Sequence, residues 1–153
     1  MSLRDRIPED LKSALKNKNT LELTVLRMLQ SAIKNREIEN NKRELTDEEV
    51  IGVIGTEIKK RREAAKEYEK VGRPEAAADE TAEMDILMKY MPEQMGEEEI
   101  RSLVSVAIEQ SGASGMKDMG KVMKEIMPKV KGKADGALVN KLVKEGLENL
   151  KGE

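Results

Sequence analysis

Apolar residues recur every three to four positions along most of the chain, which is the spacing of amphipathic α-helices. In the first half this spacing predicts helices over residues 3–16, 20–40, 46–72 and 74–92. The second of these is expected to bury a stripe made of Leu21, Val25, Met28, Leu29, Ala32 and Ile33. Proline at position 92 ends the fourth helix, and the segment 92–96 is predicted to separate two halves.

Local signals fix where several helices begin. Ser2 is predicted to cap the first helix. The third helix should begin with a capping box, in which Thr46 bonds the backbone of Glu49 and Glu49 reaches back. Gly52 and Gly55 lie inside that helix, where each costs about 1 kcal/mol relative to alanine. Close approach of another helix is the expected reason for both glycines.

Three shorter helices are predicted after residue 96. They cover residues 97–110, 117–127 and 136–150, and Asp135 is expected to cap the last one. A glycine- and serine-rich turn over residues 111–115 separates the first two. The sequence therefore predicts an all-α protein with a four-helix domain over residues 1–92 and a three-helix domain over residues 97–153.

Composition supports this fold and removes several chemistries. Two tyrosines are the only aromatic residues, so aliphatic side chains and ten methionines must fill the core, as in helical bundles. The methionine stripes are therefore expected to be core. Histidine and cysteine are both absent, which removes the commonest general base, the commonest transition-metal ligand and thiolate chemistry. We predict no catalytic centre, metal site or cofactor site.

Carboxylates and glycines offer no clear alternative site. Glu97, Glu98 and Glu99 point in different directions around a helix and lie at its start, where acidic residues favour the helix dipole. A glycine-rich phosphate loop of either common pattern is missing. No apolar run approaches the roughly 18 residues of a membrane span, and the first ten residues are polar. We therefore expect a cytoplasmic protein without membrane contact.

Charge is distributed unevenly although the net charge is only −2. Residues 73–100 carry nine acidic and two basic side chains, whereas residues 116–144 carry eight lysines and three acidic side chains. A row of lysines can neutralise nucleic-acid phosphates, but lysines on an exposed helix face also simply favour solubility. Without aromatic platforms for bases, any nucleic acid should be recognised by shape. The lysines are Lys117, Lys121, Lys124, Lys129, Lys131, Lys133, Lys141 and Lys144.

Several stretches of the sequence resemble the YqeY family. The most specific are residues 118–123 and 127–136, in which a methionine–glycine–lysine run is followed by the lysine–glycine–lysine turn and Asp135. Residues 25–27, 44–49, 72–73 and 87–92 also match the family pattern, so the similarity covers essentially the whole chain. Members of this family are small, all-helical, two-domain proteins.

The resemblance also carries functional expectations. The family is similar to the tail of the B subunit of tRNA-dependent amidotransferase, a carbon–nitrogen ligase that takes nitrogen from glutamine. In that complex the tail contacts tRNA, while catalysis occurs on domains without a counterpart here. The resemblance implies a tRNA-binding accessory module, with an amidotransferase complex or an aminoacyl-tRNA synthetase as the partner. A protein–protein adaptor without nucleic acid is the alternative, and a lone amidotransferase is a third hypothesis.

Overall fold

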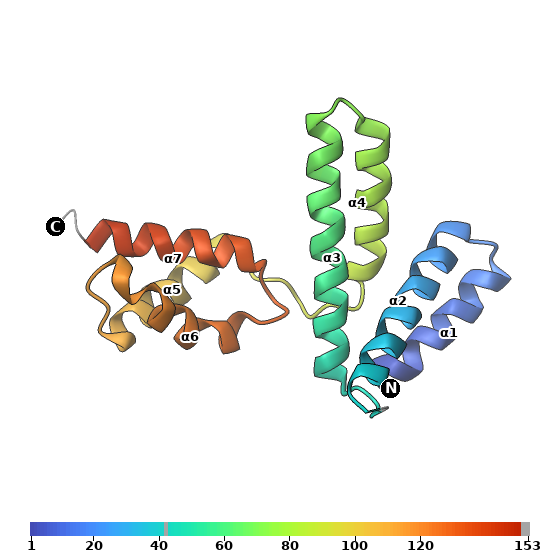
Figure 1. The fold of residues 1–153 in the computed structure, drawn as a ribbon, viewed down its shortest axis with the longest axis horizontal. Helices are drawn as coiled ribbons and strands as arrows, with labels where there is room; N and C mark the ends of the chain where they lie inside the picture. The colour runs from blue at the N-terminus through green and yellow to red at the C-terminus, as the bar shows by residue number, and fades with distance from the viewer. Residues whose placement is uncertain (42, 151–153) are drawn as a thin grey trace. The chain divides into compact units, whose positions relative to one another are not determined.

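A computed structural model describes residues 1–41 and 43–150, and their regular structure is entirely helical (Figure 1). The all-α prediction is confirmed. The helices of the first half are α1 (Leu3–Lys16), α2 (Thr20–Glu39), α3 (Asp47–Lys70) and α4 (Pro74–Met88). Those of the second half are α5 (Glu97–Ser111), a 3-10 turn η1 (Met116–Asp118), α6 (Met119–Val130) and α7 (Gly136–Leu150).

The chain forms two compact units, the first covering Met1–Met91 and the second beginning at Pro92. In the first unit, α1 lies alongside α2 and α3 lies alongside α4, so that two helical hairpins make up the unit (Figure 1). Their apolar faces share one core. Its buried members are Ile7, Val25, Leu26, Leu29, Ile33, Leu45, Val50, Val53, Ile54, Ile58, Ile86, Leu87 and Tyr90.

The predicted helix caps are confirmed. The Ser2 side chain accepts a hydrogen bond from the backbone of Asp5 at the start of α1. Both halves of the capping box form at the start of α3, because Thr46 accepts from the Glu49 backbone and the Glu49 carboxylate accepts from the Thr46 backbone. At the start of α7, Asp135 accepts from the Ala137 backbone. These bonds satisfy amide groups that a helix start leaves without an intrahelical partner.

The Glu49 carboxylate also makes two hydrogen bonds with the Arg43 guanidinium, at 2.8 and 2.7 Å. These bonds, followed by the backbone hydrogen bond from Thr46, lower the pKa of Glu49 from 4.5 to about 2. A carboxyl group whose pKa is lower in the folded chain stabilises the fold above its unfolded pKa. That contribution is lost as the pH falls from about 4.5 towards 2.

We therefore expect the free energy of unfolding of the first unit to fall with decreasing pH across this window, and to fall less steeply in Glu49→Gln. Chemical denaturation followed by circular dichroism at several pH values measures both slopes. Glu63→Gln, at an exposed position of the same helix, is the control and should keep the wild-type slope. Equal slopes in wild type and Glu49→Gln would contradict the assignment.

The predicted apolar stripe of α2 is wrong at two positions. Val25, Leu29 and Ile33 are buried, but Leu21 is 40% exposed and Met28 is 48% exposed. Both lie on a side of α2 that no other helix of the first unit covers completely. A stripe read from spacing is broad, so it could not separate the buried residues from apolar residues at its border.

The explanation for the glycines of α3 is also wrong. A Cβ added to Gly52 would meet nothing within 4 Å, and one added to Gly55 would only touch the end of Met91, at 4.0 Å. Close approach occurs instead at Gly146 in α7, where an added Cβ would lie 2.7 Å from Ile108 Cδ1 of α5. A larger residue at Gly146 would therefore have to displace the end of the Ile108 side chain, whereas neither glycine of α3 has such a neighbour.

The second unit has its own core, formed where α5, α6 and α7 pack against one another (Figure 1). The segment after Pro92 belongs to this unit, because the Met95 amide donates to the Lys133 carbonyl and Gln94 donates to the Gly132 carbonyl. Buried members of this core are Ile100, Val104, Ala107, Val122, Ile126, Val130, Val139, Leu142, Val143 and Leu147.

The methionine stripes pack against the two cores, as the sequence predicts. Met84, Met88 and Met91 are partly buried against the first core, and Met116, Met119 and Met123 against the second. Met127 is the exception, with 38% of its surface exposed. The helix that carries it extends three residues further than expected, through Pro128, whose missing N–H removes only one hydrogen bond of the last turn.

Candidate nucleic-acid interface

The lysine-rich segment begins at a turn with defined geometry. Gly112 ends α5 in the left-handed conformation, with φ of 70°, which glycine adopts at no steric cost. The Asp118 carboxylate then accepts hydrogen bonds from the Ser114 amide, at 2.9 Å, and from the Ser114 hydroxyl, at 3.3 Å. The amide hydrogen bond is the main reason that the pKa of Asp118 is lowered, and the positive charges of Lys117 and Lys121 contribute further.

Lysines of η1 and α6 point to solvent. Lys117, Lys121 and Lys124 are exposed, while Val122 and Ile126 on the other side of α6 are buried. Lys129 is exposed in the last turn of α6, but Glu125 is exposed on the same helix and reduces the local positive charge.

The turn between α6 and α7 carries two more exposed lysines, Lys131 and Lys133, on a fixed backbone. The Lys133 amide donates to the Val130 carbonyl at 2.9 Å, and the Lys133 carbonyl accepts from the Met95 amide at 2.8 Å. Gly132 between them adopts a φ of 76°. The backbone positions of both lysines are therefore set by hydrogen bonds to residues before and after the turn.

Lys141 and Lys144 are exposed on α7, on the side of the helix away from the buried Leu142 and Val143. This surface has mixed charge, because Glu148 is exposed one turn beyond Lys144. Glu145, next to Lys144, lies 3.4 Å from Arg101 of α5.

The eight lysines divide into two groups along the chain. The six residues from Lys117 to Lys133 follow one another along η1, α6 and the turn, whereas Lys141 and Lys144 lie on α7. Within the described part of the chain, none of the eight forms an ion pair, so their charges are available to a ligand.

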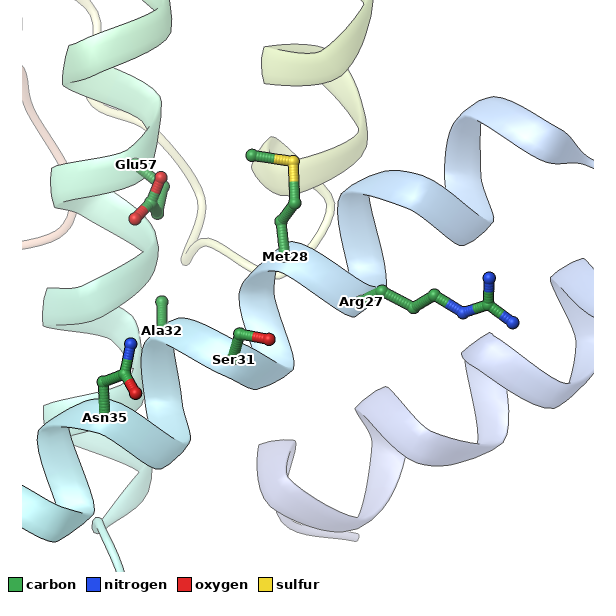
Figure 2. Close-up of a pocket in the computed structure, with 6 residues that line it drawn as sticks. All are labelled: Arg27, Met28, Ser31, Ala32, Asn35 and Glu57. Atoms are coloured by element: carbon green, nitrogen blue, oxygen red, sulfur yellow. The ribbon is translucent and has the colours of Figure 1, made fainter.

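Two features of the first unit were missed by the sequence analysis. An open pocket of about 430 Å³ lies between α2 and α3. Figure 2 shows Met28, Ala32 and Asn35 on the side of α2 that faces Glu57, while Arg27 points to the opposite side. Next to the pocket, Arg61 of α3 is only 5% exposed, and its Nη2 lies 3.8 Å from the Met28 sulfur. The pocket depends on how α2 and α3 pack, which the spacing along one helix does not encode, and nothing in the sequence marks Arg61 as buried.

Among residues 1–41 and 43–150, no three acidic side chains come close enough to hold a metal ion. In those ranges, no helix has the length and apolar character needed to cross a membrane.

Comparison with known proteins identifies a family and several relatives. The family described as Yqey-like protein matches residues 4–147. A protein of Pyrenophora tritici-repentis named "Altered inheritance of mitochondria protein 41, mitochondrial" is 32% identical over 143 residues, which cover 92% of this chain and 78% of that protein. Proteins of the same name are 34% identical over 59% of the chain in Clavispora lusitaniae and 33% identical over 54% in Saccharomyces cerevisiae. These two matches span about half the length of the relatives, 52% and 44%.

The prediction of a cytoplasmic protein is contradicted by these relatives, because their names place them in mitochondria. The physical reason for the error is that the lack of a long apolar segment bears only on crossing a membrane. It does not distinguish one aqueous compartment from another.

Proposed function

Because the chain belongs to the Yqey-like protein family, we propose that it is a tRNA-binding accessory protein whose second unit holds the phosphate backbone. The observation that carries the proposal is the run of six exposed lysines from Lys117 to Lys133. Within the described residues, none of the six forms an ion pair. Their backbone is held by the Ser114–Asp118 turn and by the hydrogen bonds around Lys133. The surface therefore presents positive charge at fixed positions.

The chemistry of this surface favours contacts to phosphates over contacts to bases. Lysine is a compact point charge that does not make the bidentate contacts with which arginine reads guanine. Both tyrosines, Tyr68 and Tyr90, belong to the first unit, so the second unit has no aromatic ring on which a base could stack. Recognition in this proposal depends on the shape of the RNA backbone.

The resemblance to the tail of the amidotransferase B subunit supports tRNA as the nucleic acid. In this proposal, the transfer of nitrogen from glutamine takes place on a partner, an amidotransferase complex or an aminoacyl-tRNA synthetase. This chain contributes binding and orientation of the tRNA.

Charge reversal of three lysines tests the proposal. We expect Lys121→Glu/Lys124→Glu/Lys133→Glu to abolish tRNA binding near physiological salt. At lower salt, the slope of log affinity against log salt should decrease by roughly 2 to 3, since about one counterion is released per phosphate contact. Fluorescence anisotropy with labelled bulk tRNA over a salt series measures both quantities.

The matched control is Lys12→Glu/Lys16→Glu/Lys66→Glu. It changes the net charge by the same amount at exposed lysines of the first unit. The proposal requires this control to bind nearly as well as wild type. Equal loss in both triple variants would show that only the overall charge matters, and no binding of wild type at low salt would exclude the proposal outright.

A protein–protein adaptor is the second candidate function. The methionine stripes pack largely against the two cores, so they offer little free surface to a protein partner. The exposed Leu21 and Met28 of α2, together with Ile38 at 55% exposure, favour it instead. Capture of a defined protein partner by wild type and not by Met28→Glu, without measurable tRNA binding, would favour the adaptor.

A further inference from the structure

One side of α2, which borders the open pocket towards α3, is an uncharged face in a chain of which 38% of residues are charged. Six exposed positions recur along it at alternating intervals of three and four residues and extend over roughly 26 Å of helix. None of the six is charged, and three of them are large apolar side chains. The six residues are Leu21, Thr24, Met28, Ser31, Asn35 and Ile38.

This face is less polar than its composition suggests. The Thr24 hydroxyl donates to the Thr20 carbonyl at 2.9 Å, so its hydrogen bond is made within the helix and its methyl group is left for packing. Exposed faces of other helices carry charges at comparable positions, such as Lys12 and Lys16 on α1, or Lys141 and Lys144 on α7. An apolar, uncharged surface rimmed by charged side chains is typical of a protein interaction site.

The alternating spacing of these exposed residues fits a helix as the partner. Intervals of three and four residues give a repeat of 3.5, which keeps one face of a helix in contact with a second helix along a left-handed supercoil. Leu21, Met28 and Asn35 occupy the first core position of successive heptads. We infer that this face pairs in parallel with the same face of α2 in a second copy of the chain, forming a symmetric dimer.

Asn35 favours a second copy in parallel register. In a parallel pair each core position meets its own counterpart, so Asn35 lies beside Asn35 of the second copy and the two amides can hydrogen-bond. A single asparagine at this heptad position specifies a two-stranded, in-register pair, at a cost in stability. Leu21 and Met28 then also meet their own counterparts, where apolar contact is favourable.

Charges beside the face agree with the parallel arrangement. By helical spacing, Arg27 and Lys34 lie on one flank of the face and Glu39 lies on the other. Figure 2 shows Arg27 pointing away from the side on which Glu57 lies. Two parallel helices bring opposite flanks together, so Lys34 approaches Glu39 of the second copy and Arg27 approaches its Ala32, beside Glu57. An antiparallel pair would bring Arg27 next to Lys34 of the second copy, where like charges repel.

Sedimentation velocity of the full chain over a wide concentration range tests the dimer. With three polar residues among six contact positions, we expect a concentration-dependent dimer rather than a permanent one. Met28→Glu should weaken self-association about tenfold or more, and Asn35→Leu should strengthen it, because an apolar residue replaces the buried amide. Val71→Glu is the control, since Val71 is 66% exposed at the end of α3 and should leave the dimer unchanged.

Cysteine cross-linking tests the orientation. Because the chain has no cysteine, Leu21→Cys, Ile38→Cys and Val71→Cys each introduce a single thiol. The parallel dimer predicts disulfide-linked dimers for Leu21→Cys and for Ile38→Cys, at opposite ends of the face, and not for Val71→Cys. An antiparallel pair would link neither end, and a monomer at all concentrations would leave the face for a helix of another protein; either result overturns the inference.

Discussion

Replacing Arg61 with alanine is expected to lower the free energy of unfolding of the first unit by about 2–3 kcal/mol. Arg61 Nη1 donates to the Glu57 carboxylate at 2.9 Å and to the Glu57 carbonyl at 3.1 Å, while Nε lies 3.3 Å from the Glu83 carboxylate. The guanidinium thus joins α3 to α4 and reaches Met28 of α2. Removing it leaves the Glu83 carboxylate without its buried partner, and leaves Glu57 only the exposed Lys60, whose Nζ lies 3.8 Å from the Glu57 carboxylate.

The size of the effect follows from burial. Removing one member of a buried ion pair costs about 3–5 kcal/mol. Arg61 is 5% exposed, but the Glu57 and Glu83 side chains are 18% and 23% exposed, so water can compensate in part. The buried Nε also has no hydrogen-bond partner, which means that the guanidinium is incompletely satisfied even in the native chain. We therefore expect the lower part of that range or slightly less.

A charge-free triple variant separates the loss of charge pairing from the loss of packing. Glu57→Gln/Arg61→Met/Glu83→Gln removes all three charges and keeps side chains of similar volume. Buried ionic groups replaced together by neutral ones of similar size often cost little, so this variant should recover most of the stability that Arg61→Ala loses. Urea denaturation gives the three free energies. If Arg61→Ala is as stable as wild type, the ion pairs contribute nothing, and the argument from burial is wrong.

The Arg61 cluster also illustrates what the sequence could and could not predict. Helix starts were predictable because a cap such as Thr46 with Glu49 depends on residues three positions apart. Arg61 stands beside Arg62 in a charged stretch, and only the packing of α2 and α4 against α3 makes one of the two buried. Leu21 and Met28 were wrongly assigned to the core because spacing alone does not distinguish a buried helix face from an exposed face with heptad spacing.

For the lysines, too, one property could be predicted from the sequence and another could not. Their exposure was predictable from the opposite side of each helix, where Val122 and Ile126 or Leu142 and Val143 recur at helical spacing. Whether they form one surface depends on how α6 and α7 pack, which no local pattern encodes. The contact of Gly146 with the Ile108 side chain of α5 is equally invisible from the neighbours of Gly146 in sequence.

Truncating Ile126 is expected to unfold the second unit and leave the first one folded. Ile126 is fully buried at the centre of the second core, which shares no member with the first core. An isoleucine-to-alanine change in a core costs about 2–5 kcal/mol. A unit of this size has only about 3–9 kcal/mol of stability, so Ile126→Ala removes a large share of it and the unit should unfold in mild urea that leaves wild type folded.

Two-dimensional NMR of the full chain measures this result for each unit. In Ile126→Ala, at a urea concentration that leaves wild type folded, amide signals of residues 97–150 should collapse to unfolded positions, while those of α1 to α4 keep their folded positions. Leu29→Ala, at a buried position of the first core, should give the reverse pattern. Met127→Ala is the control next to Ile126, because Met127 is 38% exposed and its truncation should leave both sets of signals in place.

Which unit unfolds in each core variant decides whether the two units are independent domains. Separate cores predict two unfolding transitions in wild type, and each core variant should shift only one of them. If Ile126→Ala and Leu29→Ala both unfold the whole chain in a single transition, the two units are one cooperative domain despite their separate cores. In that case a charge-reversal variant of the second unit could also unfold the first unit. Both units of such a variant must then be shown to be folded before a loss of RNA binding is assigned to the lysines.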